Sequence, residues 1–220
     1  MHANFAASHF YFHICSMQHI KNIIFDFGNI FLNIDVSITE KAFIALGVSN
    51  FPSLYSLADA SDLFEKLETG HISPDEFYDG FRLATQTKLQ NEEIKNAWNA
   101  LLLDYPAERL HWLNDIRNKY NIYLYSNTNK IHYDEFTQRF QPVNDIEKFN
   151  DYFIKAWYSH EIKMRKPYPE SFSALLQSEN LSADETLFVD DTSKNIEGAR
   201  MAGLHTFHLP PPMTVFDLPL

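Results

Sequence analysis

Cysteine, long apolar runs and a recognisable targeting segment are scarce or missing in this chain of 220 residues. Cys15 is its single cysteine, so no disulfide can form within the chain, and a reducing compartment is the simplest environment. No apolar run approaches the roughly 18 residues that a membrane-spanning helix needs. Residues 1–19 lack a basic start and a clean apolar core, so they make a poor signal peptide. We therefore expect a cytoplasmic protein.

The first 19 residues also carry His2, His9 and His13, which makes a metal site there conceivable. A loosely ordered leader is the better interpretation, because chain termini are commonly poorly ordered unless something ties them down.

Positive charge is also in short supply. The chain has 18 Lys and Arg residues against 29 Asp and Glu residues, which gives a formal net charge of −11. Nucleic acids and anionic membranes attract basic surfaces, so neither is expected as a partner. An anionic substrate would need a local positive charge. With 45% hydrophobic residues, 19 Phe and 11 Tyr, the composition is that of a globular protein rather than a disordered one.

Hydrophobic patterns divide the chain into a core and an insert. Residues 20–35 begin with an apolar run typical of a buried parallel strand, and residues 36–105 then follow helical patterns without a strand. Within this insert, Ser73 and Glu76 form a capping-box pattern around Pro74, which predicts a helix start. Four helices are expected in the insert.

From Pro106 onward the pattern changes. Short apolar strands alternate with helices as far as residue 209, which predicts a parallel sheet covered on both faces. We therefore assign residues 20–35 and 106–209 to one α/β core. Residues 210–220 are expected to be a C-terminal tail, because Pro210 to Pro212 close the ordered domain.

Polar side chains follow three of the expected strands at the point where each strand ends. In open parallel sheets ligands bind just outside these carboxyl ends, so the side chains are expected to share one edge of the sheet. A lysine in the loop EIKMRKPYPESF enters from the same side. The residues concerned are Asp26, Ser126 with Asn127 and Thr128, Asp190 with Asp191, and Lys166.

This combination suits phosphoryl transfer through a carboxylate nucleophile. An attacking carboxylate splits hydrolysis of a phosphate ester into two easier steps. Nucleophile and phosphate are both anionic, so a lysine and a divalent cation must offset their repulsion. Mg²⁺ prefers hard oxygen ligands, which matches the carboxylates of Asp26, Asp190 and Asp191 together with one main-chain carbonyl.

The order of four segments resembles the motifs of the haloacid dehalogenase-like (HAD) superfamily. The segments are FDFGN, YLYSNTN, MRKPYPESF and FVDDTSKNIEGARMAG, and the resemblance covers about residues 20–209. It implies a three-layer, Rossmann-like parallel sheet core. The insert looks like the small four-helix cap of the subgroup that contains α-glucose-1-phosphatase and the N-terminal phosphatase domain of epoxide hydrolases.

The resemblance also implies a role for each matching residue. It makes Asp26 the nucleophile and, together with the carbonyl of Gly28, a Mg²⁺ ligand. Ser126 and Asn127 would bind the phosphate, and Lys166 would bridge phosphate and nucleophile. Asp190 and Asp191 would surround Mg²⁺, with Asn195 behind them. The expected activity is hydrolysis of small phosphorylated metabolites, most simply sugar phosphates, through an aspartyl phosphate.

One position departs from the usual phosphatase pattern. A second Asp normally lies two residues after the nucleophile and acts as general acid and base, whereas this chain has Gly28 there. General acid catalysis typically contributes about 10² to 10⁴ in rate. We therefore expect either a substrate with a good leaving group, such as an anomeric sugar phosphate, or a proton supplied by water or by a cap residue.

Two alternatives remain open. A 2-haloacid dehalogenase would use the same Asp26 to attack carbon, although such chemistry needs neither Mg²⁺ nor the paired acids Asp190 and Asp191. A catalytically weak protein that binds phosphorylated metabolites is supported by Gly28 alone.

Some further residues are assigned structural roles. Asp35, Glu65 and Glu68 are expected to be solvated charges. Of the histidines, only His71, at the start of a capped helix in the insert, is kept as a candidate site residue. The three tryptophans, Trp98, Trp112 and Trp157, are expected in the core.

Overall fold

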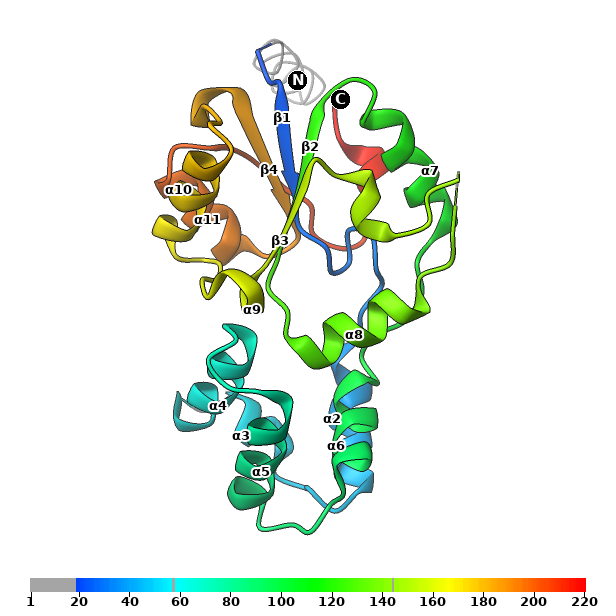
Figure 1. Ribbon diagram of the computed structural model, residues 1–220, viewed down its shortest axis with the longest axis vertical. Helices are drawn as coiled ribbons and strands as arrows, with labels where there is room; N and C mark the ends of the chain where they lie inside the picture. Colours follow the sequence, from blue (N-terminus) through cyan, green and yellow to red (C-terminus); the bar gives the residue numbers. More distant parts are fainter. Residues whose placement is uncertain (1–18, 57, 144) are drawn as a thin grey trace, which may run out of the picture.

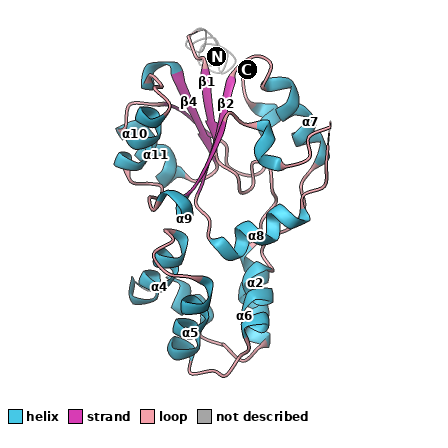
Figure 2. Cartoon of the chain, in the orientation of Figure 1, coloured by secondary structure: helices cyan, strands magenta, loops and turns pink. Residues whose placement is uncertain are grey.

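The computed structural model describes residues 19–56, 58–143 and 145–220. They form a five-stranded parallel sheet with helices on both faces, and a helical insert lies beyond the carboxyl ends of the strands (Figures 1 and 2). The strand order is β3-β2-β1-β4-β5. The strands are β1 (Asn22–Phe25), β2 (Asn121–Ser126), β3 (Lys155–Tyr158), β4 (Thr186–Asp190) and β5 (His205–His208). The expected fold class is confirmed.

Alternate side chains of the central strands pack into two different cores. Phe25, Leu124 and Val189 face the layer that contains α7 (Ala107–Ile116). Their neighbours in sequence, such as Ile24 and Phe188, face α10 (Pro169–Ser178) and α11 (Ser193–Met201). Successive side chains of a strand point to opposite faces of the sheet, so both faces must be covered to bury this set.

The remaining helices of the core connect the strands or border the sheet. They are α8 (Lys130–Arg139), α9 (Ser159–Ile162), and the short 3₁₀ helices η1 (Phe149–Tyr152), η2 (Ala183–Glu185) and η3 (Val215–Asp217). Nowhere in the described ranges is there a helix long and apolar enough to cross a membrane.

The insert, which we call the cap, packs around its own aromatic cluster. Phe43 and Phe51 stack with ring centroids 4.4 Å apart, and the expected core residue Trp98 is buried among them. The described part contains α2 (Val36–Ala45), α3 (Phe51–Ser56), α4 (Ala58–Glu68), α5 (Pro74–Thr85) and α6 (Asn91–Asn99). The short α3 is additional to the four helices expected from the sequence.

The predicted start of α5 is confirmed. Glu76 Oε2 accepts a hydrogen bond from the Ser73 backbone N–H at 2.7 Å, and Ser73 Oγ accepts one from the Glu76 N–H at 3.3 Å. The two bonds satisfy backbone donors that a helix terminus otherwise leaves free.

The C-terminal residues correct one expectation. The ordered domain does not end at Pro210 to Pro212, because the chain continues into η3 and packs against the core. Val215 and Leu218 are buried there, and η3 contacts α7. Burial of these apolar side chains removes apolar surface from water, which stabilises the folded chain beyond the prolines.

At the other end of the chain, the expected leader lies outside the described residues except for His19, and so do His2, His9 and His13.

Candidate active site

The three predicted strand ends meet at one edge of the sheet. In the parallel register Phe25 pairs with both Leu124 and Val189, so Asp26 comes level with Asp190, and Ser126 lies one residue further along β2. A cavity of about 470 Å³ opens at this edge, between the core and the cap. It is lined by Asp26, Gly28, Asn29, Ile34, Tyr55, Ser126, Asn127, Arg165, Lys166, Pro167, Asp191, Thr192, Lys194 and Asn195. Of the polar residues predicted at this edge, Thr128 and Asp190 are absent from the lining, and both are buried.

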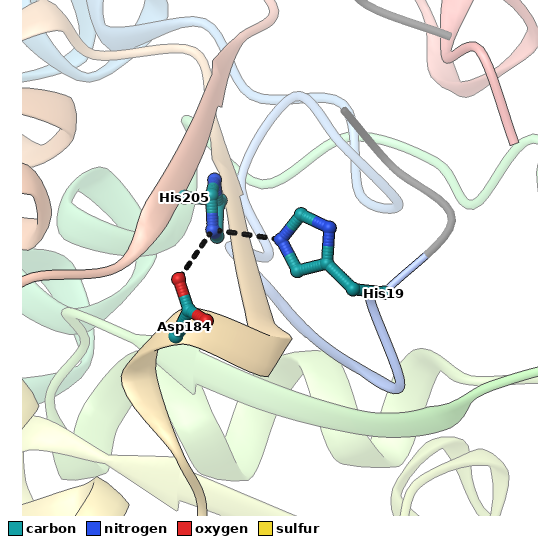
Figure 3. Close-up of side chains that lie close together, drawn as sticks. All are labelled: His19, Asp184 and His205. Atoms are coloured by element: carbon teal, nitrogen blue, oxygen red, sulfur yellow. Dashed lines mark hydrogen bonds and ion pairs between the residues drawn. The ribbon is translucent and has the colours of Figure 1, made fainter. Parts of the chain in front are cut away.

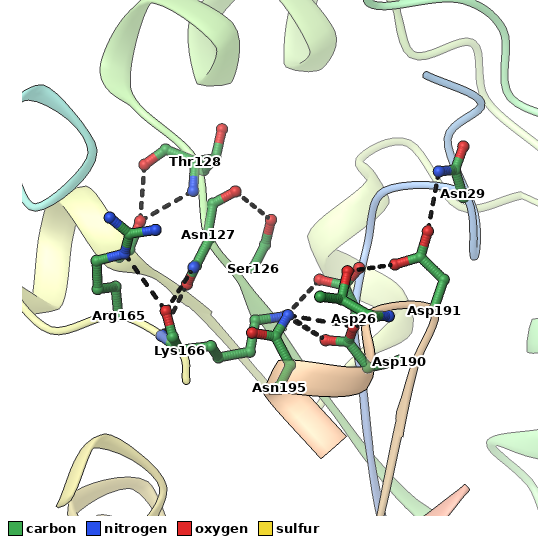
Figure 4. A network of polar contacts seen from close by, with 12 residues as sticks. Asp26, Asn29, Ser126, Asn127, Thr128, Arg165, Lys166, Asp190, Asp191 and Asn195 are labelled. Atoms are coloured by element: carbon green, nitrogen blue, oxygen red, sulfur yellow. Dashed lines mark hydrogen bonds and ion pairs between the residues drawn. The ribbon is translucent and has the colours of Figure 1, made fainter. Parts of the chain in front are cut away.

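Lys166 occupies the centre of the site. Its side chain is 1% exposed, and its Nζ lies 2.5 Å from Asp26 Oδ1 and 2.8 Å from Asp190 Oδ2 (Figure 4). The rings of Tyr125 and Phe188 each lie 5.4 Å from Nζ. A buried ammonium is stable only when it is paired and hydrogen-bonded, and both carboxylates supply that pairing.

The backbone of Lys166 is held by the side chain of Asn127. The Asn127 Nδ2 donates to the Lys166 carbonyl at 2.9 Å, and Asn127 Oδ1 accepts from the Lys166 N–H at 3.0 Å. Sequence reasoning gave Asn127 a role on the phosphate and missed this one. The side chain is thus used to position Lys166, and its backbone N–H remains the group of this residue suited to bind phosphate.

Burial and neighbouring charges shift the pKa values of Asp26 and Lys166. Burial raises the pKa of Asp26 to about 7, although the nearby Lys166 opposes the shift and Asp190 and Asp191 add to it. Burial alone would lower the pKa of Lys166, but the carboxylates of Asp190 and Asp26 outweigh it and raise that pKa. Lys166 is therefore a permanent cation, and the excess negative charge around it calls for a second one.

The three acids form a set of oxygen donors that fits a divalent cation. One carboxylate oxygen from each of Asp26, Asp190 and Asp191 lies within 4.8 Å of the others. Asp190 accepts hydrogen bonds from Asn195 Nδ2 at 3.0 and 3.2 Å and from the Thr192 N–H at 2.8 Å, in addition to Lys166. Hard oxygen ligands of this kind suit Mg²⁺. Because Asp190 is so fully engaged, Asp191 is the acid of the pair with more freedom to bind a metal.

Asn29 is a site residue that sequence reasoning missed. Its Nδ2 donates to Asp191 Oδ2 at 2.9 Å, and its Oδ1 accepts from the Ile34 N–H at 3.2 Å. The backbone of Asn29 has φ +59°, a left-handed conformation that Asn tolerates better than most residues. Arg109 Nη1 donates to the Asn29 carbonyl at 2.8 Å and fixes this turn from α7. Its place directly after Gly28, three residues from Asp26, could have indicated from the sequence that Asn29 belongs to the site.

The cap contributes a charged contact to the cavity. Arg165 lines the cavity, and its Nε lies 3.0 Å from Glu68 Oε1, while its Nη1 lies 3.6 Å from Glu65 Oε2. Glu68 is therefore not the solvated charge that we expected, whereas the Glu65 side chain stays 41% exposed. Burial raises the pKa of Glu68, and Arg165 opposes that shift. The two acids of α4 hold an arginine of the core at the boundary between the two parts.

Two further residues, Asp35 before the cap and His71 within it, lie outside the cavity lining. Asp35 caps α2, since its Oδ1 accepts from the Ser37 N–H at 2.9 Å, in line with its expected structural role. His71 receives or donates a hydrogen bond with Thr69 Oγ1 at 2.7 Å and lines a neighbouring cavity of about 400 Å³ that Arg165 also borders.

Comparison with known proteins decides the family. The model of the family described as haloacid dehalogenase-like hydrolase matches residues 23–209, which include the four motif segments. The chain belongs to this family. The superfamily expected from the four motifs is therefore confirmed, and the subgroup stays a prediction.

Several HAD proteins are similar to this chain over most of its length. A D-ribitol-5-phosphate phosphatase of Bacteroides thetaiotaomicron is 33% identical over 86% of this chain and 91% of its own. A HAD family enzyme from the same species, solved in complex with magnesium and inorganic phosphate, is 34% identical with a TM-score of 0.80, covering 88% of this chain and 96% of its own. A HAD-like hydrolase of Porphyromonas gingivalis is 27% identical with a TM-score of 0.78, covering 87% and 91%.

These similarities agree with the chemistry of the site. The chain is a phosphatase of the HAD family, as the retained carboxylates and lysine predict. Solved 2-haloacid dehalogenases, such as one from Pseudomonas syringae at 17% identity and a TM-score of 0.51, share the fold alone.

Proposed function

We propose that this HAD phosphatase uses Mg²⁺ to hydrolyse phosphate esters of small sugars or sugar alcohols through an aspartyl-phosphate intermediate. The observation that carries the proposal is the Lys166 ammonium, buried between Asp26 and Asp190 with Asp191 in the same cluster. A relative named for D-ribitol-5-phosphate supports the substrate class, and a relative solved with magnesium and phosphate supports the cofactor.

Asp26 is the nucleophile in this proposal. Its free carboxylate oxygen attacks phosphorus, an O–P bond forms, and the bond from phosphorus to the substrate oxygen breaks. Lys166 offsets the charge on the phosphoryl oxygens, while the Ser126 hydroxyl and the Asn127 N–H donate hydrogen bonds to them. Water then attacks the aspartyl phosphate, which releases inorganic phosphate and restores Asp26.

The metal site in this proposal consists of Asp26, the carbonyl of Gly28 and Asp191. Asp190 acts beside it by holding Lys166. When bound, Mg²⁺ supplies positive charge that lowers the repulsion between the phosphate and the carboxylates. Asn29 and Asn195 orient Asp191 and Asp190 through the hydrogen bonds described above.

The leaving alcohol still needs a proton, and Gly28 cannot donate one. Two substrates separate the possible sources. D-ribitol-5-phosphate releases an unactivated primary alkoxide, whereas α-D-glucose-1-phosphate releases a better anomeric leaving group. Comparable kcat values on both would mean that water or a cap residue supplies the proton. Turnover of the anomeric ester alone would mean that leaving-group reactivity replaces the missing acid.

Arg165 is the residue that we expect to select the substrate. It offers a second positive charge in the cavity, and Glu65 and Glu68 of the cap hold it there. Binding of the phosphorylated sugar would place its hydroxyl groups against the cap, which closes the site and excludes water. Replacing Glu68 by Gln should raise KM for sugar phosphates more than KM for an aryl phosphate that lacks these hydroxyl groups.

The decisive test is release of phosphate from p-nitrophenyl phosphate and from the two sugar phosphates. The wild type is compared with Asp26→Asn, each with Mg²⁺ and with a chelator. Asp35→Asn is the matched control, because it makes the same change at an exposed helix cap where Asn also caps well. Turnover that needs Asp26 and Mg²⁺ but not Asp35 supports the proposal.

Other outcomes point to the two alternatives. Chloride release from chloroacetate without Mg²⁺ would indicate a dehalogenase. A rise in Tm with sugar phosphates without turnover would indicate a binding protein.

A further inference from the structure

A second cluster of metal-binding side chains lies at the opposite edge of the sheet. His19 comes just before β1, Asp184 lies in η2 just before β4, and His205 is the first residue of β5. All three therefore meet at the amino ends of adjacent strands (Figure 3). Asp190 is the last of the five residues of β4, so the strand alone sets the cluster roughly 13 Å from it, at about 3.3 Å per residue over four steps. The cluster is independent of the phosphatase site.

The donor atoms of the three side chains point toward one another. His19 Nε2 lies 3.0 Å from His205 Nε2, and His205 Nε2 lies 3.5 Å from Asp184 Oδ1. Two ligands bound to Zn²⁺ at about 2.0–2.1 Å in a tetrahedron are about 3.3 Å apart. These two spacings differ from this value by a few tenths of an ångström, and all three donor atoms lie within 4.8 Å of one another, so side-chain adjustments would bring them around one ion.

The chemistry of the cluster selects the kind of metal. Two imidazole nitrogens and one carboxylate suit Zn²⁺ and similar transition metals, whereas Mg²⁺ prefers oxygen ligands. The nearby Lys21 is paired with Glu185 at 2.6 Å, which leaves the negative charge of Asp184 for a cation. The Asp184 side chain is 89% exposed, so water can reach the ion and complete its coordination.

We propose that His19, Asp184 and His205 bind one divalent transition-metal ion, such as Zn²⁺, at the amino edge of the sheet. The ion links the segment that enters β1 to β4 and β5, which lie more than 160 residues away in the chain. Binding to the folded state alone stabilises a protein by mass action, so the metal raises Tm without taking part in phosphate hydrolysis.

Co²⁺ serves as the spectroscopic probe, because its d electrons give visible absorption, whereas Zn²⁺ has a filled d shell and gives none. The full chain is titrated with Co²⁺ in saturating Mg²⁺, and the bound Co²⁺ is then displaced by Zn²⁺. We expect the visible absorption of a four-coordinate site in the wild type. The single variants His19→Ala, His205→Ala and Asp184→Asn should each weaken Co²⁺ binding by at least about tenfold. Replacing residues that only orient metal ligands commonly lowers metal affinity by that much.

Three controls keep the result interpretable. His111→Ala changes an exposed histidine on α7 and should bind Co²⁺ as the wild type does. A full chain with His2, His9, His13 and Cys15 replaced by Ala tests the donors that lie outside the described residues. Circular dichroism and Mg²⁺-dependent turnover check that each variant is folded.

The outcomes decide the proposal directly. Loss of Co²⁺ absorption and of the Zn²⁺-induced rise in Tm in the three cluster variants, with both retained in the controls, supports it. Equal affinity and stoichiometry in the wild type and in all three folded cluster variants would refute it. Loss of binding in the His2, His9, His13 and Cys15 variant alone would assign the metal to that segment instead.

Discussion

Replacing Lys166 by Met tests whether its buried charge stabilises the site as well as the reaction. Met has a similar length and no charge, so the change removes the two charged contacts of Nζ, at 2.5 Å to Asp26 and 2.8 Å to Asp190. Removing one partner of a buried ion pair typically costs about 3–5 kcal/mol, because the remaining charge is left without compensation. Two carboxylates lose their partner here, so we expect the free energy of unfolding to fall by about this amount in metal-free buffer.

Magnesium should reverse part of that loss. With Lys166 absent, the carboxylates attract a cation more strongly, so Mg²⁺ should raise the Tm of the variant by more than it raises the Tm of the wild type. Turnover of p-nitrophenyl phosphate should nevertheless stay low, because a charge contact to the transferring phosphoryl group is commonly worth about 10² or more in kcat.

Urea unfolding with and without Mg²⁺, together with phosphate release, measures these effects. Lys194→Met is the control for the unfolding measurement, since Lys194 is an exposed lysine at the rim of the same cavity. An unchanged free energy of unfolding in Lys166→Met, or a smaller Mg²⁺ effect than in the wild type, would refute this electrostatic account.

Three further predictions concern single residues. Gly28→Asp should raise kcat on D-ribitol-5-phosphate more than on p-nitrophenyl phosphate, by up to about 10² if the missing acid limits the rate; equal effects on both substrates would exclude that explanation. Burial lowers the pKa of His132 to about 3. The unfolded chain, with an ordinary histidine pKa near 6.5, therefore takes up a proton that the folded protein refuses, and about 2 kcal/mol of stability is lost between pH 6.5 and pH 5. His132→Gln should flatten this slope in urea titrations, and His111→Gln should not. A Cβ at position 198 would lie 1.9 Å from the Pro167 carbonyl oxygen; Gly198→Ala should therefore displace the loop that carries Lys166 and lower both Tm and kcat, and an unchanged kcat in a folded variant would contradict this.

Much of the fold and the site followed from local patterns in the sequence. The strands β2 and β4 end at Ser126 and Asp190 within one residue of their expected positions, because apolar runs that stop at polar residues mark strand ends. Parallel strands bring such ends to one edge of a sheet, so the meeting of Asp26, Ser126 and the two acids could be inferred without coordinates.

The missed features depend on contacts between distant segments. Periodicity identifies Glu68 as a residue of a helix, but it does not show that Arg165 lies 3.0 Å away in space. The burial of Val215 beyond the proline run likewise depends on a surface that α7 offers. Asn127 was assigned to phosphate from its position at a strand end, and its reciprocal bonds to the Lys166 backbone depend on where a separate loop returns to the sheet.

The strand order has a consequence for the timing of synthesis. β1, which ends beside Asp26, is made before either of its neighbours, since Asn22 pairs with Asn121 on one side and with Thr186 on the other. Until those partners emerge, β1 is an apolar segment without neighbours, and Asp26 has neither its lysine nor its acids. A nascent or truncated chain that stops before β4 lacks Asp190 and Asp191, which lie beside Asp26 in the folded protein. The cluster of acids around Lys166 therefore forms only after β4 has been made. Until then the apolar β1 is open to aggregation, as exposed apolar segments of partly folded chains are.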